Sequence, residues 1–220
     1  LWELFPDRLD DEGKPEGWLD GTLEDVANLQ NGYAFKSSDW LVDGIPVVKI
    51  GAVKPSVVDL KNVSFVDSKF LKEKPNFILK SGDILIGLTG YVGEVGRVPP
   101  SQLTPMLNQR VARFLPEASF YAYIFCIGRQ KEFKEFVENQ AHGSAQANVS
   151  TKDVLTYPIV IPTMNLSAFF DENVGLILEK IDENLSEIDT LTQLRDLLLP
   201  KLMSGEISIR DAEKMVEDAA

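Results

Sequence analysis

The feature that most constrains this chain is a long helical segment near its C-terminal end. From Ser167 to Met203 the sequence contains one glycine, Gly175, and one proline, Pro200. Apolar residues recur there at alternating steps of three and four, the spacing of a heptad repeat. At about 1.5 Å per residue the segment predicts a helix of roughly 55 Å, much longer than the average globular helix. We therefore expect a coiled-coil-type helix that needs a second helix as partner. A surface helix folded back on its own domain is the alternative.

A seven-residue frame defines the seam of this helix. The seam residues are Val174, Ile177, Ile181, Asn184, Ile188, Leu191, Arg195 and Leu198. The two polar members, Asn184 and Arg195, would set the register of a pair at some cost in stability. Residues 164–205 are thus predicted to form a spacer and dimerisation helix, and residues 206–220 an acidic tail that frays at its end.

Residues 1–163 are predicted to form a β-rich domain. Short apolar segments between glycines and prolines are typical of strands, and the clearest are Ile45–Val53, Asp83–Leu88, Val95–Val98, Val111–Leu115 and Tyr157–Ile161. Helical spacing predicts one amphipathic helix from Ser119 to Gln140. Ser150, with Asp153 three positions later, predicts the start of a short helix. The expected fold class is α+β, a mixed β-rich domain followed by one long helix.

The charge is unevenly distributed along the chain. The net charge of −12 argues at first against nucleic acid, whose binding relies on Lys and Arg. Residues 1–25, however, hold nine acids and two bases, and residues 164–220 hold thirteen acids and five bases. The centre, residues 26–163, therefore has fifteen bases and twelve acids, a net charge of +3. This balance permits DNA binding by the centre without demonstrating it.

Several chemistries find no support in the sequence. A single cysteine, Cys126, excludes a disulfide framework and any paired-cysteine metal site, and His142 is the only histidine. No nucleophile and base set or clustered carboxylates are present, so we predict no enzyme activity of its own, no cofactor and no metal. No apolar run is long enough for a membrane span and no signal segment opens the chain, so a cytoplasmic location is expected.

The densest glycine cluster spans residues 87–96. Its spacing fits neither dinucleotide nor phosphate loops, and a strand follows it in place of a helix. It is either a glycine-rich turn or bulge, or a backbone held close to a ligand such as a DNA strand.

Three polar stretches lie at element ends within the basic centre: residues 33–38, residues 108–110 with Arg113 nearby, and residues 143–148. Their Asn, Gln, Arg and Ser side chains can pair with base edges and phosphates, and Lys fixes register on the backbone. Each stretch taken alone could be a loop that satisfies its own backbone. Together they favour one DNA surface, with these expected members: Tyr33, Lys36, Ser37, Ser38, Lys49, Thr89, Tyr91, Asn108, Gln109, Arg110, Ser144, Gln146 and Asn148.

At this point the chain resembles the specificity subunits of type I restriction-modification systems. The segments that carry the resemblance are LFPD at 4–7, PEGW at 15–18, GIPVVKIG at 44–51, GDILI at 82–86, TGYVG at 89–93, NQR at 108–110, GSAQAN at 143–148 and LLPKLMSGEI at 198–207. The last of these is the most specific.

The resemblance implies a target-recognition domain followed by a conserved spacer helix. Full-length members carry two such units, whose helices pack antiparallel so that each domain reads half of a split DNA sequence. A chain with one unit is then a half-size subunit or the second half of a larger one. The implied partners are double-stranded DNA, methyltransferase subunits, a restriction subunit, and a second recognition unit or a second copy of the chain. A coiled-coil interaction protein without DNA binding is the alternative; a fused restriction-modification enzyme is disfavoured because no catalytic motif fits.

Overall fold

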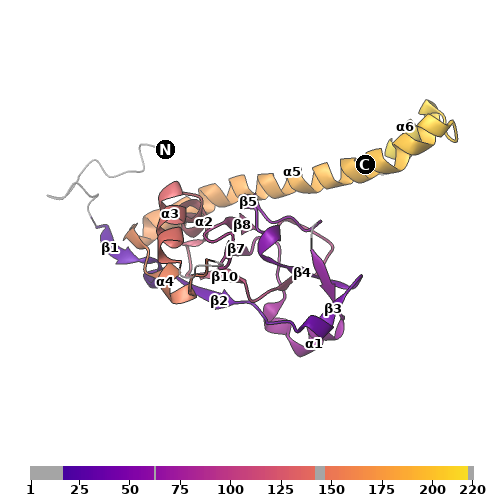
Figure 1. Cartoon of the computed structure of the whole chain (residues 1–220). Helices are drawn as coiled ribbons and strands as arrows, with labels where there is room; N and C mark the ends of the chain where they lie inside the picture. The colour runs from indigo at the N-terminus through magenta and orange to yellow at the C-terminus, as the bar shows by residue number, and fades with distance from the viewer. Residues whose placement is uncertain (1–16, 62, 142–146, 218–220) are drawn as a thin grey trace. The chain divides into compact units, whose positions relative to one another are not determined.

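The computed structural model of the chain describes residues 17–61, 63–141 and 147–217 (Figure 1). The chain divides into two compact units, Leu1–Ile177 and Leu178–Ala220. One long helix, α5 (Met164–Ser204), begins in the first unit and continues into the second. Within the described residues, no helix combines the length and the apolar character that crossing a membrane requires.

The first unit is built on three β-sheets. A five-stranded sheet has the order β2-β10-β7-β8-β5, with β2 at Ala27–Asn31, β10 at Val111–Pro116, β7 at Ile84–Gly87, β8 at Val95–Arg97 and β5 at Ser56–Val57. A four-stranded sheet has the order β3-β6-β4-β9, with β3 at Trp40–Leu41, β6 at Ser64–Val66, β4 at Ile45–Val48 and β9 at Met106–Leu107. Strands β1 (Leu19–Thr22) and β11 (Pro158–Ile161) form an antiparallel pair.

Three helices cover one face of the five-stranded sheet: α2 (Tyr121–Gly128), α3 (Lys131–Gln140) and α4 (Thr151–Leu155) (Figure 1). Side chains alternate along a strand, so Ile84 and Ile86 of β7 enter the core beneath these helices. Leu85 lies between them in sequence and enters a second core together with Val48 and Leu107. The central strands are therefore buried on both faces. We call residues 121–157, with the sheet face that they cover, the helical side.

The opposite side of the unit carries the four-stranded sheet, helix α1 (Lys69–Glu73) and short 3-10 turns (Figure 1). Its own core consists of Phe35, Val47, Val66, Phe70 and Met106. Tyr33, Trp40 and Phe77 pack against this core as half-buried rings. We call residues 33–77 of this region the small-sheet side.

Four of the five clearest predicted strands are confirmed to within one residue at each end, and the other is shortened further. The segment Ile45–Val53 forms a strand only to Val48, because residues Ile50–Ala52 form a 3-10 turn. The short helix predicted from Ser150 is confirmed as α4, and the Ser150 hydroxyl accepts a hydrogen bond from the Asp153 N–H at 3.1 Å. These elements have signals that lie within a few residues of sequence.

The single helix predicted for Ser119–Gln140 is wrong. The chain forms two helices, α2 and α3, because Gln130 adopts an extended backbone with ψ of 144°. Gly128 ends α2 where the backbone approaches β8: a Cβ atom added at Gly128 would lie 2.9 Å from a methyl carbon of Val95. Two helices at an angle can follow the twisted sheet beneath them, and the apolar residues of both still enter one core.

The long helix is confirmed as α5, which spans all but the last residue of the predicted range 164–205. Ser167 and Asp171, one turn apart, join its beginning to the α2 N-terminus. The Ser167 hydroxyl donates to the Ser119 carbonyl and the Ala122 N–H donates to the Asp171 carboxylate, each at 2.5 Å. Asp171 thus satisfies one of the N–H groups that the first turn of α2 leaves without a helical partner.

The predicted tail contains a helix, α6 (Ile209–Glu217). Ser208 and Asp211 cap its start, with the Ser208 hydroxyl donating to the Asp211 carboxylate at 2.6 Å. That hydrogen bond is the main cause that lowers the pKa of Asp211. The Ser-x-x-Asp pattern of this cap is a local signal in the sequence. The fraying expected at the end of the tail stays a prediction.

Candidate nucleic-acid interface

The parallel pairing of β4 with β9 brings two predicted segments to one edge. Val48 pairs with Leu107, and the Asn108 N–H donates to the Val48 carbonyl at 3.2 Å. Because parallel strands end at the same edge of a sheet, Lys49 and the turn containing Gln109 and Arg110 emerge side by side.

Backbone and side-chain hydrogen bonds add three further segments to this edge. The Gln109 N–H donates to the Tyr33 carbonyl at 3.0 Å, and the Leu88 N–H donates to the Arg110 carbonyl at 2.9 Å. The Thr89 hydroxyl, directly after Leu88, donates to the Asn148 side-chain carbonyl at 2.7 Å. We call this group the strand-end surface: Tyr33, Lys49, Thr89, Gln109, Arg110 and Asn148.

Charge on the strand-end surface is positive. Arg110 is exposed and Lys49 is half-buried, and neither forms an ion pair with any other residue that the structure describes. Burial, and secondly the charge of Arg110, lower the pKa of Lys49. A nearby anion would relieve both the burial cost and the mutual repulsion of the two cations. The arrangement therefore suits a phosphate group.

Asn108 differs from its two neighbours. It is 3% exposed, and its side-chain carbonyl accepts a hydrogen bond from the Arg110 N–H at 3.3 Å. The close approach of Gly32 explains this burial, since a Cβ atom at Gly32 would lie 2.2 Å from the Asn108 carbonyl oxygen. Asn108 thus shapes the turn that presents Gln109 and Arg110, both of which are exposed.

Arg113, which the sequence places near this stretch, is part of an internal network. Its guanidinium donates to the Asp83 carboxylate at 2.9 Å and to the Gln30 side chain at 2.5 Å. It also donates to the carbonyls of Asn76 at 3.2 Å and Ile78 at 3.1 Å. These bonds join β2 and β10 to the turn before β7, so Arg113 stabilises the fold below the surface.

The segment Lys36–Ser38 reaches the same region through Trp40. Lys36, Ser37 and Ser38 are exposed in and before a 3-10 turn, and the Lys36 N–H donates to the Asp39 carboxylate at 2.7 Å. Trp40 follows directly, and the Lys49 ammonium lies 3.5 Å from the centre of its ring. Trp40 was not among the predicted residues, and a contact between residues nine positions apart in different elements has no sequence signal.

The glycine cluster forms a tight turn after β7. Gly90 and Gly93 have positive φ values of 79° and 76°, which favour glycine. A Cβ atom at Gly87 would lie 2.4 Å from the Tyr91 carbonyl oxygen. The turn presents Tyr91, which is 64% exposed and has the Lys54 ammonium 5.9 Å from its ring centre. Backbone packing within the protein therefore accounts for three glycines without a ligand.

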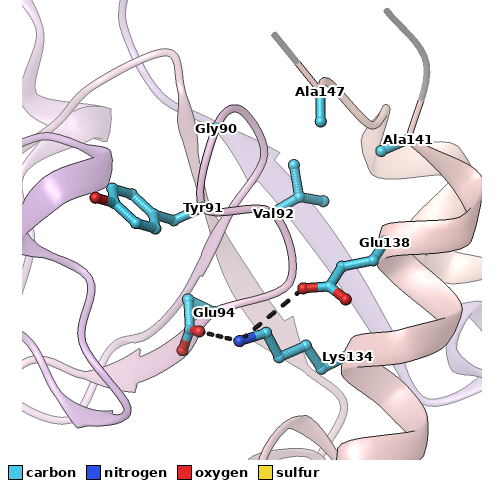
Figure 2. Close-up of a pocket in the computed structure, with 8 residues that line it drawn as sticks. All are labelled: Gly90, Tyr91, Val92, Glu94, Lys134, Glu138, Ala141 and Ala147. Atoms are coloured by element: carbon cyan, nitrogen blue, oxygen red, sulfur yellow. Dashed lines mark hydrogen bonds and ion pairs between the residues drawn. The ribbon is translucent and has the colours of Figure 1, made fainter.

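Beside this turn lies a cavity of about 280 Å³, lined by Gly90, Tyr91, Val92, Glu94, Lys134, Glu138, Ala141 and Ala147 (Figure 2). Figure 2 shows Lys134 held between the carboxylates of Glu94 and Glu138, while the ring of Tyr91 points away from them. The hydrogen bond that the Lys134 ammonium donates to Glu94 is the main cause that raises the pKa of Lys134. Two carboxylates around one ammonium make the cavity unsuitable for a phosphate.

Two predicted surface residues, Ser144 and Gln146, lie outside the described residues. Of the predicted helix seam, Ile177, Ile181, Ile188 and Leu191 are 41–59% exposed, and Asn184 and Arg195 are also exposed. Val174 is half-buried and Leu198 is 8% exposed. Arg195 binds its neighbour Asp196 at 2.7 Å.

Comparison with known proteins decides the family. The model of the family described as type I restriction modification DNA specificity domain matches residues 15–196. The chain belongs to this family. It is 25% identical over 203 residues to the type I restriction enzyme MjaVIII specificity subunit of Methanocaldococcus jannaschii, covering 90% of this chain and 48% of that protein. It is 26% identical over 200 residues to the HindI specificity subunit of Haemophilus influenzae, covering 88% of this chain and 42% of that protein.

The fold agrees with this family assignment. A crystal structure of the S subunit of a type I restriction-modification system from M. genitalium matches with a TM-score of 0.56 at 16% identity, covering 90% of this chain and 48% of that chain. The α+β fold class and the resemblance read from the sequence are thus confirmed. The specificity-domain chain described here spans about half the length of the relatives that it matches.

Proposed function

We propose that this chain is a non-catalytic DNA-recognition and scaffold unit of a type I restriction-modification complex. It reads one half of a bipartite target and recruits methyltransferase subunits, which flip out the base that they modify. The observation that carries the proposal is the strand-end surface, where segments from five places in the sequence meet around two cations. Neither cation has a carboxylate partner among the residues that the structure describes. We expect the unit to bind its DNA target in the cytoplasm.

Roles on the surface follow from exposure and chemistry. Gln109 and Arg110 are exposed on a turn that Asn108 holds from below, and their side chains can pair with adenine and guanine edges in the major groove. Lys36 and Lys49 suit backbone phosphates, which position a protein on the duplex without reading its sequence. Thr89 and Asn148 already bond to each other, so they shape the surface and have less freedom to read a base.

The test is a gel-shift and methylation assay of the full chain with its methyltransferase subunits. Arg110→Ala or Gln109→Ala is expected to cost about 1–3 kcal/mol of binding and to relax the preference at one base pair. Lys36→Ala should weaken binding to all DNA sequences alike. Lys131→Ala serves as the matched control, because it removes one charge from α3, where Lys131 is paired with Glu135 at 2.9 Å. An unchanged sequence preference in the Gln109→Ala/Arg110→Ala double variant would place the reading surface elsewhere.

Pairing through α5 is the second part of the proposal. Four apolar seam residues of the helix stay exposed in the single chain: Ile177, Ile181, Ile188 and Leu191. Covering them against another helix removes apolar surface from water, and a homodimer or a second recognition unit can supply that helix. Two antiparallel units would read two half-sites in inverted orientation.

Light scattering tests the pairing. Ile188→Asp should turn a dimer into a monomer, while Ser186→Asp, which adds the same charge beside the seam, should not. A wild-type chain that stays monomeric at all concentrations, alone and with a second recognition unit, would contradict the proposal.

A further inference from the structure

Among the described residues, the lysines that contact another side chain include two groups with different partners. Lys131, Lys134, Lys180 and Lys201 each have a carboxylate oxygen within 4.0 Å. Lys49, Lys69 and Lys74 instead lie over aromatic rings, with the ammonium 3.5, 5.5 and 5.0 Å from the centres of Trp40, Phe70 and Tyr33. None of these three ring-held lysines forms an ion pair within the described part of the chain.

The three rings belong to one cluster on the small-sheet side. Phe35 links them: its ring centre lies 4.9 Å from that of Tyr33, 5.5 Å from that of Trp40 and 5.2 Å from that of Phe70. Phe35 and Phe70 are 7% and 5% exposed, so the base of the cluster is buried in the core. Close-packed rings hold their positions, and the lysines over them share a rigid support.

A ring holds an ammonium without cancelling its charge. The negative face of the ring attracts the cation, and the aliphatic stem packs on apolar surface, but the net charge of +1 remains. A carboxylate would instead neutralise that charge and weaken its attraction for an anionic ligand. Ring contact therefore leaves three positive charges on this side and restricts the movement of their side chains. Less freedom is then lost when each one contacts an anion.

We propose that Lys49, Lys69 and Lys74 are phosphate-contacting residues for duplex DNA, and that Trp40 is the residue that positions Lys49. The proposal rests on the proposed DNA-recognition function and extends its surface along the small-sheet side. Tyr33 and Lys49 belong both to the strand-end surface and to the lysine and ring contacts, so the two areas are continuous. Neither Lys69, Lys74 nor Trp40 was predicted from the sequence.

DNA fits Lys49, Lys69 and Lys74 better than an acidic protein does, because these lysines adjoin the strand-end surface. Phosphate contacts fix the register of a protein on the duplex, and base-reading side chains need such a register to be useful. Gln109 and Arg110 lie directly beside Lys49 on the adjoining strand end. Backbone contact with base reading requires cations held on rings next to exposed amide and guanidinium groups, and Lys49 beside Gln109 and Arg110 supplies this combination.

Salt dependence provides the test. The full chain is titrated with a fluorescent mixed-sequence duplex between about 50 and 200 mM salt, where each phosphate contact contributes about 0.9 to the slope of log K against log salt. The Lys49→Ala/Lys69→Ala/Lys74→Ala variant should lower that slope by about 2 to 3. The matched control is Lys72→Ala/Lys80→Ala/Lys152→Ala, three exposed lysines with no ring contact or ion pair in the described structure. It loses the same charge, and we expect a change of less than about 1.

Trp40 is tested through its coupling to Lys49. Trp40→Leu should lower affinity several-fold while leaving the salt slope near that of wild type, and Trp40→Phe, which keeps a ring, should restore most of the affinity. In a Lys49→Ala background Trp40→Leu should cause no further loss. A purely structural tryptophan would weaken binding equally in both backgrounds. Lys49→Ala truncates a half-buried side chain and leaves the ring cluster in place, so it keeps the test valid if Trp40→Leu lowers stability.

Each outcome is decisive. Equal slopes for the two triple variants overturn the inference while DNA recognition stands. The Lys49→Ala/Lys69→Ala/Lys74→Ala variant could instead lose methyltransferase co-purification while its salt slope stays unchanged. That result would mean that the three lysines bind an acidic protein, and it also overturns the inference. Absence of binding by the wild-type chain, with and without its methyltransferase, at about 50 mM salt contradicts the proposed function itself.

Discussion

Lysines that contact another side chain have different partners on the helical side and on the small-sheet side of the first unit. On the helical side Lys134 binds Glu94, and Lys131 binds Glu135. On the small-sheet side Lys49 and Lys74 lie over rings. The carboxylates of the helical side neutralise lysine charge above a large apolar core. The rings of the small-sheet side leave the lysine charge available to a ligand. Cations without a carboxylate partner are tolerated where a ligand of opposite charge binds. The contrast therefore distinguishes a surface that stabilises the fold from a surface that binds a ligand.

The largest expected effect tests the core of the helical side. Phe133 is fully buried, and its ring meets that of Tyr157 edge-on at 5.1 Å. Phe133→Ala should lower the free energy of unfolding by about 3–5 kcal/mol, because the cavity cannot fully collapse. Lys49→Ala on the small-sheet side should change it by less than about 0.5 kcal/mol. Urea denaturation of both variants measures the difference, and equal losses would erase the distinction between the two sides.

A second prediction compares a mostly buried ion pair with an exposed one. Arg113 and Asp83 are 14% and 20% exposed. Arg113→Met would remove the guanidinium from the Asp83 carboxylate and from the carbonyls of Asn76 and Ile78. The Asp83 carboxylate and the Asn76 carbonyl would keep the Lys80 N–H and the Gln30 amide as neutral donors. We expect a loss of about 3 kcal/mol. Lys134→Met breaks a pair whose lysine is 41% exposed and should cost less than about 1 kcal/mol. Thermal melting of the two variants decides the order, and the reverse order would contradict it.

The third prediction uses the alkaline range. Burial, and secondly Tyr157, raise the pKa of Tyr123 from 10.0 to about 12, and its hydroxyl donates to the Val160 carbonyl. A raised pKa stabilises the folded state below the unfolded value of 10.0, and this contribution is lost as pH rises through the folded value. The stability of wild type should therefore fall more steeply between pH 10.0 and about 12 than that of Tyr123→Phe.

The control for this prediction is Tyr91→Phe, because the Tyr91 side chain is 64% exposed. At neutral pH Tyr123→Phe should cost about 1 kcal/mol for the lost hydrogen bond, and Tyr91→Phe about nothing. Parallel stability curves for wild type and Tyr123→Phe above pH 10.0 would contradict the account of Tyr123.

The smallest effect concerns Lys49 and Arg110 and leaves stability untouched. Arg110→Ala should raise the pKa of Lys49 toward its ordinary value, only partly, because burial is the larger cause of its lowering. Arg129→Ala, an exposed arginine on the helical side, should leave it unchanged. An NMR titration of the lysine side chains measures both. An unchanged pKa in Arg110→Ala would mean that the two cations of the strand-end surface lie too far apart to share a phosphate.

Part of this arrangement could be predicted because its signal is local. Strands β7, β8 and β10 lie within short segments rich in apolar residues, and Ser150 with Asp153 encodes the cap of α4. Strands of two residues, such as β3 and β9, have no periodicity to detect. The break between α2 and α3 escaped prediction because apolar spacing continues through Gln130, while the Gly128 backbone must fit against Val95.

The predicted surface shows the same division. Residue type and position at element ends singled out Lys49, Gln109 and Arg110, and the structure brings these together. Burial of Asn108 and the internal role of Arg113 could not be foreseen, because both depend on contacts with strands distant in sequence. Trp40 and Lys74 were missed for the same reason: each matters only through a partner in another element.

By itself, then, the sequence determined the long helix, the β-rich character of the preceding domain, the acidic ends around a basic centre, and the family. These properties depend on composition and on periods of a few residues, which any local stretch of chain carries with it. Only the tertiary structure decided which lysines have a carboxylate partner that neutralises their charge. Whether a lysine meets a carboxylate or a ring depends on which strands become neighbours, and long-range packing of the whole core sets that choice.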